Sequence, residues 1–309
     1  MFIDISANLT DDMFDGVYHD KRRHDCDLEQ VIERAKGASC TEMIVLAGTL
    51  TDAQKCLEIC NRFDPACQSL YTTVGFHPTR CGEALMLAGE DSSDAEAEEK
   101  LFKAFSTFII GAGPTRVVAI GEFGLDYDRL HFCSKDVQKR FFEIQLRVAA
   151  RFPDLPLLLH LRNAFDDFVD IIGRYNVRGV VHSFTGSRAE MERLVEMGLY
   201  IGINGCSLRD ALDVVPHIPD DKLLIETDAP YCDIRPTHPA YGYLEGFEVP
   251  KSVKPEKFVS ESYVKGRNEP ACINQVAFAL AGLRKMDYLT LSNRIRTNTL
   301  RLFSRIVKP

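Results

Sequence analysis

Four short apolar segments of this chain share one design, which constrains the fold more than any other feature. Each has the composition of a strand buried on both faces of a parallel sheet, and each ends at a side chain that can bind a metal. One is residues 117–121, followed by Glu122, and the other three lead to His160, His182 and Asp228. One such segment means little, whereas four predict a parallel α/β sheet with a divalent-metal centre on one face.

The spacing of the strand ends predicts the size of the sheet. Successive strands end at residues 160, 182, 204 and 228, so 22, 22 and 24 residues separate them, enough for a strand, a helix and two loops each. Eight strands are expected, at residues 2–6, 43–48, 70–76, 117–122, 157–160, 180–182, 200–204 and 222–227. This alternation predicts a (β/α)8 barrel that forms a single domain over residues 1–309, and an open doubly wound sheet is the alternative.

Helices are expected between the strands, where apolar residues recur at helical spacing. They are residues 27–38, residues 50–63, a helix ending near residue 110, residues 134–152, a helix that Gly198 closes, and helices within 270–306. Residues 83–100 are rich in Ser, Asp and Glu and are expected to form an exposed excursion. Residues 230–268 are expected to form a long loop, and such a loop after a barrel strand is typical of a substrate wall.

Composition excludes several classes of protein. With 45% hydrophobic and 27% charged residues, the chain has the composition of a soluble globular protein. A formal net charge of −8 argues against gripping duplex DNA through a basic surface, although bound metals supply positive charge locally. No apolar run is long enough to cross a bilayer and the start resembles no signal peptide. A cytoplasmic location is therefore expected, with nuclear entry left open, no membrane partner and no obligate protein partner.

The ten cysteines are scattered along the chain, without a CxxC pair. In a chain of this size, that pattern favours reduced thiols in a cytosolic-type compartment over a disulfide framework. Cys206 and Cys232 lie near expected strand ends, and without a paired base they are expected to be packing residues.

The strand-end residues are predicted to act together. Parallel strands of a barrel all end at one face, so Glu122, His160, His182 and Asp228 are predicted to surround one opening as metal ligands. Imidazole nitrogens and carboxylate oxygens suit Zn, Mn and Mg. Glu122 and Asp228 are also predicted to be catalytic, because a divalent ion activates water near neutral pH and Asp228 can accept the proton of that water. Crowded at one rim, these charged groups need a compensating cation.

Two further residues near strand ends are candidates for binding substrate. His77 follows the third strand, where a substrate contact and a packed turn are both open. Arg162, two residues after His160 and on the same side of the strand, can hold a phosphate or form a salt bridge. Glu226 lies two residues before Asp228 and deeper in the strand, so it is expected either to support a metal ligand through a hydrogen bond or to be structural.

Five segments of the chain, in order and at suitable spacing, resemble the successive motifs of the TatD family. They are residues 75–78 (GFHP), 121–126 (GEFGLD), 160–164 (HLRNA), 182–186 (HSFTG) and 226–230 (ETDAP). Residues 8–14 and 267–270 further resemble the eukaryotic TatD DNase domain-containing 1 type. The resemblance extends from Phe2 to the C-terminal helices.

This resemblance implies a metal-dependent deoxyribonuclease with an amidohydrolase-like TIM barrel. It implies metal ligation by Glu122, His160, His182 and Asp228, with Mg as the working ion and Zn or Mn as alternatives. The implied reaction is hydrolysis of DNA phosphodiester bonds by 3′→5′ trimming of single-stranded DNA, in DNA repair or DNA fragmentation. Whether cleavage starts at ends or internally stays open.

One departure from the family concerns the first strand. Most members open with Asp-x-His-x-His, whose histidines bind one of two metals, whereas this chain has Asp4, Ser6 and Asn8 at the corresponding places. The site around Glu122 is expected to remain, and the other site to keep only carboxylates and water. Oxygen-only coordination favours Mg over Zn. We therefore expect one firmly held metal and a second, weakly held one.

Two other functions are compatible with these residues. A barrel of the same superfamily could use the same ions to hydrolyse esters or amides, as a D-aminoacyl-tRNA deacylase does. Loss of the first-strand histidines could instead leave a non-catalytic binding protein, although the retained ligands argue against it. For a nuclease, the expected partner is DNA, with single strands or ends preferred, and loop aromatics such as Tyr127 offer stacking faces for bases.

Overall fold

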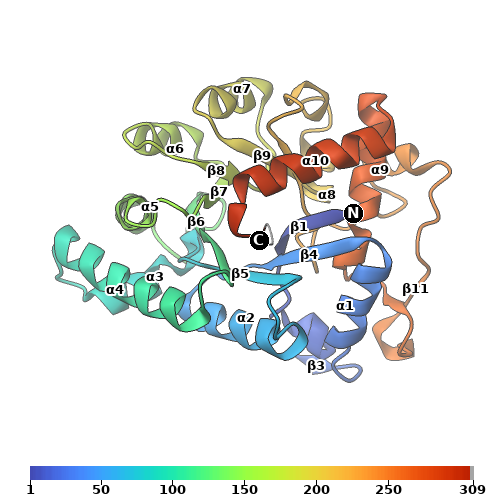
Figure 1. Cartoon of the computed structure of the whole chain (residues 1–309), viewed down its shortest axis with the longest axis horizontal. Coiled ribbons are helices and arrows are strands. Elements are labelled where there is room, and N and C mark those ends of the chain that lie inside the picture. The colour runs from blue at the N-terminus through green and yellow to red at the C-terminus, as the bar shows by residue number, and fades with distance from the viewer. Residues whose placement is uncertain (307–309) are drawn as a thin grey trace. The chain divides into compact units, whose positions relative to one another are not determined.

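The computed structural model describes residues 1–306 and contains eight strands in one sheet (Figure 1). The strand order is β1-β4-β5-β6-β7-β8-β9-β10. The strands are β1 (Phe2–Ala7), β4 (Cys40–Val45), β5 (Leu70–Val74), β6 (Val117–Asp126), β7 (Leu157–Arg162), β8 (Gly179–Val181), β9 (Tyr200–Ile203) and β10 (Leu223–Ile225). A parallel bridge between Ala7 and Ala229 joins the end of β1 to the segment after β10, so the sheet is a nearly closed barrel. The predicted (β/α)8 barrel is confirmed.

Helices separate most of the strands. The α-helices are α1 (Leu28–Gly37), α2 (Leu50–Phe63), α3 (Cys81–Ala88), α4 (Asp94–Ala112), α5 (Lys135–Ala150), α6 (Phe165–Ile172), α7 (Arg188–Glu196), α8 (Gly205–Asp210), α9 (Ile273–Arg284) and α10 (Tyr288–Leu302). Short 3-10 helices include η1 (Asp12–Asp15), η2 (Pro78–Arg80), η4 (Pro239–Leu244) and η6 (Pro270–Cys272). Two small sheets pair β2 (Val17–Tyr18) with β3 (Lys21–Arg22) and β11 (Ser252–Val253) with β12 (Tyr263–Val264). No helix within residues 1–306 combines the length and apolarity that a membrane crossing requires.

The chain divides into two compact units, which are described separately. The first unit contains Met1–Val45, Ser183–Ser187 and Gly202–Thr299. The second contains Leu46–His182, Arg188–Ile201 and the chain from Leu300. Each unit has its own buried strands: β1, β4 and β10 in the first, and β5 to β8 in the second. The expectation of a single domain over residues 1–309 stays a prediction.

A buried ionic network holds the C-terminal part of the first unit. The Arg267 guanidinium is 3% exposed and donates to Asp27 Oδ1 at 2.6 Å and to Glu269 Oε1 at 2.9 Å. Arg34 donates to Glu269 Oε2 at 2.8 Å. Breaking either ion pair of this buried arginine would leave a buried charge without a partner, which strongly destabilises the fold. The network therefore fixes the backbone at residues 267–269.

This fixed backbone positions the loop that carries Asp228. The Asn268 amide nitrogen donates to the carbonyl oxygen of Thr227 at 3.0 Å and to that of Tyr231 at 2.8 Å. The backbone N–H of Asn268 donates to the Pro230 carbonyl at 2.9 Å. Three carbonyl groups of this turn, those of Thr227, Pro230 and Tyr231, thus accept hydrogen bonds from a single asparagine, which holds the turn after β10 in one conformation.

Strand β6 is longer than the sequence predicts. The expected strand ends at Glu122, but β6 continues to Asp126 and is buried along its whole length. The prediction is wrong because Gly121 and Gly124 adopt φ angles of 152° and 151°, which change the register against β7 without ending the strand. A Cβ atom at Gly124 would lie 1.9 Å from the carbonyl oxygen of His160, so only glycine allows this approach.

The acidic stretch before β6 is helical, contrary to the predicted excursion at residues 83–100. It forms the end of α3 and the first turns of α4. Ser93 and Glu96 form a capping box at the start of α4, where acidic side chains also stabilise the helix N-terminus. Helices α3, α4 and α5 then pack against one another (Figure 1).

Cys206 and Cys232 are joined by a disulfide bond in the first unit, so their assignment as separate packing residues is wrong. The two residues are 26 positions apart and their Cα atoms lie 5.0 Å apart. The expectation of reduced thiols fits the other eight cysteines, which are free. The pairing arises from the fold, which brings the start of α8 next to the loop after β10.

Candidate metal centre

One carboxylate oxygen of the second unit lies at the centre of a group of imidazoles. Glu122 Oε1 is 2.5 Å from Nε2 of His182, 2.7 Å from Nδ1 of His160 and 3.6 Å from Nε2 of His77. Glu122 lies on β6, His160 lies on β7, and His182 follows the last residue of β8. Three of the four predicted ligands are thus brought together by consecutive strands, as the barrel geometry requires.

His77 reaches this group from the turn after β5. Its Nδ1 accepts a hydrogen bond from the Thr79 backbone N–H at 3.2 Å and lies 2.7 Å from the Thr79 hydroxyl, so the ring caps η2. This leaves Nε2 directed at Glu122. The sequence assigned His77 to substrate binding, and that role stays a prediction. Because Nδ1 accepts a hydrogen bond from a backbone N–H, the neutral ring carries its proton on Nε2, and binding of a metal there would require the other tautomer. Together, His77, Glu122 and His160 offer ligand atoms within 4.8 Å of one another.

Asp126 is a second carboxylate of the site that the sequence analysis did not single out. Its Oδ2 lies 3.3 Å from Nε2 of His160, so this imidazole lies between the Asp126 and Glu122 carboxylates. Asp126 is 1% exposed. The signal was present in the sequence, because Asp126 lies at the end of the GEFGLD motif, four residues after Glu122. Because the strand was expected to end at Glu122, the sequence did not place Asp126 at the end of β6 beside His160.

Burial and the neighbouring charges set the ionisation of these groups. Burial by itself would raise the pKa of Glu122, but the imidazoles of His182, His77 and His160 reverse this and hold it well below its usual range. Burial lowers the pKa of His77 to about 3, so this ring is neutral at physiological pH. Burial would lower the pKa of His160, but hydrogen bonds to Asp126 and Glu122 raise it above its usual value. The group therefore combines an ionised carboxylate with at least one neutral imidazole.

The chemistry of these donors fits a divalent cation. Neutral imidazole nitrogens and ionised carboxylate oxygens are ligands of Zn, Mn and Mg, and here they are buried and within a few ångströms of one another. Oxygen and nitrogen lone pairs that lie this close repel each other unless a proton or a cation lies between them. The arrangement can hold one ion between β5, β6, β7 and β8.

The fourth predicted ligand, Asp228, belongs to the first unit and has different neighbours. Its Oδ1 accepts a hydrogen bond from Asn8 Nδ2 at 2.9 Å and another from the Ser6 hydroxyl at 3.3 Å. Its backbone has φ 53°, a left-handed conformation that is uncommon for aspartate. Its N–H donates to the Ser6 carbonyl at 2.9 Å. Metal ligation by Asp228 stays a prediction.

Glu226 and Arg162 are two further residues that the sequence singled out near strand ends. Glu226 is fully buried, and its Oε1 accepts hydrogen bonds from the Ser183 N–H at 2.7 Å and from Asn204 Nδ2 at 3.1 Å. This agrees with the structural role expected for it. Arg162 is the last residue of β7 and is half-buried. Its predicted role in substrate binding stays a prediction.

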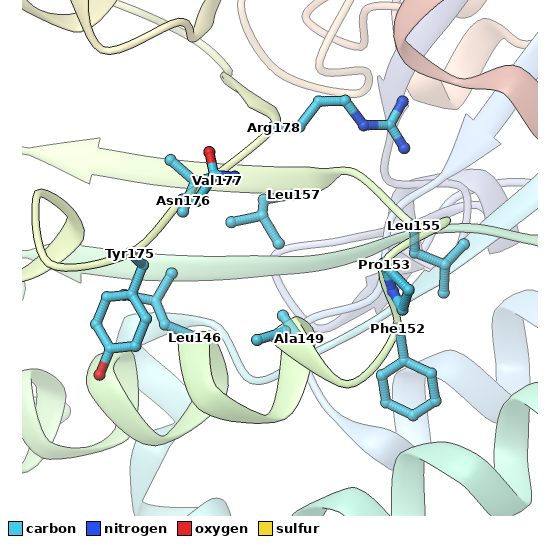
Figure 2. A pocket seen from close by; sticks show the side chains of 11 residues that line it. Leu146, Ala149, Phe152, Pro153, Leu155, Leu157, Tyr175, Asn176, Val177 and Arg178 are labelled. Atoms are coloured by element: carbon cyan, nitrogen blue, oxygen red, sulfur yellow. The ribbon is translucent and has the colours of Figure 1, made fainter.

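A separate hollow of about 560 Å³ lies near the amino end of β7 (Figure 2). Figure 2 shows Leu157, the first residue of β7, between Phe152 and Tyr175. Its lining contains neither a carboxylate nor a histidine. Because the hollow is at the end of the strand opposite His160, it is not part of the metal centre.

Fold and site together define a (β/α)8-barrel hydrolase with a buried carboxylate–imidazole centre at the carboxyl ends of its strands. The family profile described as "TatD related DNase" matches residues 3–304. The chain belongs to this family. The predicted enzyme class, a hydrolase of the TatD type that acts on ester bonds, is thereby confirmed.

Relatives and solved structures agree with this assignment. The chain is 40% identical to "Deoxyribonuclease Tat-D" of Schizosaccharomyces pombe, over 98% of this chain and 96% of the relative. It is 31% identical to "3'-5' ssDNA/RNA exonuclease TatD" of Escherichia fergusonii, over 97% and 98%. The crystal structure of an uncharacterised amidohydrolase from Saccharomyces cerevisiae superposes with a TM-score of 0.89 at 34% identity, covering 98% of this chain and 99% of that chain. The predicted resemblance to eukaryotic TatD proteins is confirmed.

Proposed function

We propose that this chain is a divalent-metal-dependent deoxyribonuclease that trims single-stranded DNA in the 3′→5′ direction. The observation that carries the proposal is the convergence of His77, His160 and His182 on one oxygen of Glu122. Two relatives, a deoxyribonuclease and a 3′–5′ exonuclease for single-stranded DNA and RNA, support the choice of substrate. A cytoplasmic or nuclear role in DNA repair or DNA fragmentation is part of the same proposal.

The firmly held ion would be bound by Glu122, His160 and His182. In the proposal, Asp228 supplies a further carboxylate for a second, weaker ion. The first unit offers a hydroxyl and an amide beside Asp228, from Ser6 and Asn8, where many TatD proteins have imidazoles. Oxygen donors favour a hard, partly hydrated ion, so Mg is the proposed working ion, while the imidazole-rich group also accepts Zn or Mn.

When bound, a divalent cation polarises a phosphate oxygen and activates water as a nucleophile near neutral pH. The residues of the chain supply the remaining functions. Asp228 accepts the proton of the attacking water, and Asn8 holds its carboxylate in orientation by the 2.9 Å hydrogen bond. Arg162 holds a phosphate oxygen of the substrate. Asp126 keeps the His160 ring in position through its contact with Nε2.

Single strands are the proposed substrate because of the charge of the protein. A net charge of −8 gives little general attraction for the phosphates of a duplex, so binding depends on local contacts at the site. A single strand or a frayed end brings one phosphodiester to the buried centre without unpairing, which a continuous duplex does not.

One assay tests the proposal and separates it from the two alternatives. Oligonucleotides labelled at the 5′ end, single-stranded and duplex, are incubated with the protein in Mg, Mn or Zn and in EDTA. We expect a ladder that shortens from the 3′ end of the single strand, only with metal, and none with Glu122→Ala. Ester or amide hydrolysis without DNA cleavage would favour the deacylase-type alternative, and metal-independent binding without any hydrolysis would favour the binding protein.

A further inference from the structure

We infer that the loop between β6 and α5, residues 127–134, holds an unpaired nucleobase of the substrate against the ring of Phe132. The inference rests on the proposed function, since it names how the nuclease recognises a single strand. It concerns residues of the second unit only, which also contains Glu122 and its imidazoles. We refer to residues 127–134 as the β6–α5 loop.

The β6–α5 loop is pinned at both ends by one buried side chain. Gln138, on α5, is fully buried and accepts a hydrogen bond from the Asp126 N–H at 2.8 Å. Its amide nitrogen donates to the carbonyl oxygens of Asp126 and Cys133, each at 2.9 Å. The two ends of the loop therefore meet at a single amide group. Because Asp126 also contacts His160, the loop is held beside the metal centre.

The tip of this loop exposes an aromatic ring that the fold does not use. Phe132 is 65% exposed, and it is the only exposed phenylalanine of the 19 in the chain, all of which lie within residues 1–306. Phe123 and Phe141, on the elements that flank the loop, are completely buried. The neighbouring Leu130 is 41% exposed. Single exposed apolar side chains are common, whereas neighbouring ones such as Leu130 and Phe132 form a patch of the kind that contacts ligands.

The surroundings of Phe132 favour a nucleobase as its partner. The His131 ring lies 4.2 Å from the Phe132 ring, tilted by 41°, so two aromatic surfaces lie side by side. Arg129 is largely exposed, and its guanidinium lies 3.5 Å from Asp126 Oδ2. Aromatic rings combined with arginine are the usual elements of single-strand binding, where each stacked base contributes regardless of sequence. Bases paired within a duplex have no free face to offer.

The aromatic residue that the sequence suggested for this loop is already engaged. The Tyr127 hydroxyl donates to Asp167 at 2.6 Å, and Lys135 Nζ lies 4.6 Å from the centre of its ring. One face of Tyr127 is thus covered by a cation and its polar end is fixed. The ring of Phe132, which is exposed at the surface of the loop, is therefore the one proposed to stack on a base.

Fluorescence gives a direct test, because the natural chain contains no tryptophan. Phe132→Trp creates a single reporter, whose emission is quenched when a base stacks on it. In EDTA, so that no cleavage occurs, the variant is titrated with a (dT) oligonucleotide and with an abasic oligonucleotide of the same length. We expect saturable quenching by the first at concentrations where the second has no effect. Equal quenching by both strands would overturn the inference.

Ile110→Trp is the matched control. Ile110 is 79% exposed on α4, which ends before the amino end of β6, whereas the β6–α5 loop follows the carboxyl end of that strand. Its emission should not respond to either oligonucleotide. A response equal to that of Phe132→Trp would show that DNA binds without preference for the loop and would contradict the inference.

Steady-state kinetics test the same contact in the working enzyme. For Phe132→Ala we expect KM for single-stranded DNA to rise roughly 5- to 150-fold, the cost of one lost base stack, with kcat within about twofold. Phe132→Tyr should restore the parent KM, and thermal unfolding should show that the alanine variant folds. Unchanged KM would overturn the inference. Base-dependent quenching without any cleavage would instead reject the nuclease proposal and leave the stacking contact standing.

Discussion

The carboxylates of Glu122 and Asp228, both predicted from the sequence as ligands and catalytic groups, have contrasting surroundings. Glu122 lies in the second unit, where one of its oxygens faces the imidazoles of His77, His160 and His182. Asp228 lies in the first unit, where a hydroxyl and an amide, those of Ser6 and Asn8, contact one oxygen. The first faces candidate metal ligands, whereas one oxygen of the second accepts two hydrogen bonds.

This difference indicates that the two carboxylates have separate tasks. A carboxylate among imidazoles is prepared to bind a cation, because nitrogen and oxygen lone pairs can point at one place once the rings are deprotonated. A carboxylate that accepts hydrogen bonds from an amide and a hydroxyl is held in one orientation, which suits a group that takes a proton from a positioned water. We therefore expect metal retention to depend on the group around Glu122, and turnover to depend also on Asp228.

The largest effect is expected for Glu122→Ala. Removal of the carboxylate that three imidazoles share should abolish tight metal binding and lower kcat/KM on single-stranded DNA by roughly 10³-fold or more, because the cation contributes several kcal/mol to the transition state. Nuclease assays and metal analysis of the dialysed protein measure both quantities. A variant that keeps its metal and its activity would place the chemistry elsewhere in the chain.

Asp228→Asn comes next. It keeps the shape of the side chain but removes the proton acceptor, so kcat should fall by roughly 10²-fold while the firmly held ion stays bound. Single-turnover kinetics and metal analysis separate the two outcomes. If the variant also loses the firm ion, then Asp228 and Glu122 share one task, and the contrast between them disappears.

His77→Ala decides between the two roles open to this residue. As a metal ligand, its loss should weaken metal affinity by roughly tenfold to a hundredfold and leave KM for DNA nearly unchanged at saturating metal. Thr79→Ala is the matched control, because it removes the hydroxyl that contacts Nδ1 but keeps the imidazole. A raised KM with unaltered metal affinity would return His77 to the substrate-binding role that the sequence suggested.

The smallest effect is expected for Asn8→Ala, which removes the 2.9 Å hydrogen bond to Asp228. The weaker hydrogen bonds to charged groups contribute about 1.5 kcal/mol, and the carboxylate itself remains, so kcat should fall by roughly tenfold. The double substitution Ser6→His with Asn8→His is the informative counterpart. This variant should bind a second Zn ion tightly in a calorimetric titration. If it does not, the missing imidazoles are not the reason why the second ion binds weakly.

The apolar patterns of the sequence were sufficient for the barrel, because strands buried on both faces are recognisable as continuous apolar runs. A side chain at or near the end of such a run was expected at the site, and His160 does lie 2.7 Å from Glu122, while its metal ligation stays a prediction. Residue-level predictions failed where backbone freedom decided the outcome: Gly121 and Gly124 let β6 continue to Asp126. Residues 83–100 were misjudged because an acidic run predicts exposure equally well in a loop and in a capped helix.

Two further features depend on distances in space that no sequence pattern contains. The Cys206–Cys232 disulfide joins residues 26 positions apart, and only the fold brings them together. The orientation of His77 depends on Thr79, which engages Nδ1 and leaves Nε2 for Glu122. The position of Phe132 is a third such feature. Only the fold shows that both ends of its loop are bound to Gln138, which leaves Phe132 at an exposed tip.

Calorimetric titration of the metal-free protein tests the central claim most directly. The parent chain, titrated with Mn or Zn, should show one tight step of about one ion per chain, followed by a weak one, with protons released as the ligands deprotonate. Glu122→Ala should show no tight step. Identical isotherms for the parent and for Glu122→Ala, or two equally tight steps in the parent, would contradict the account.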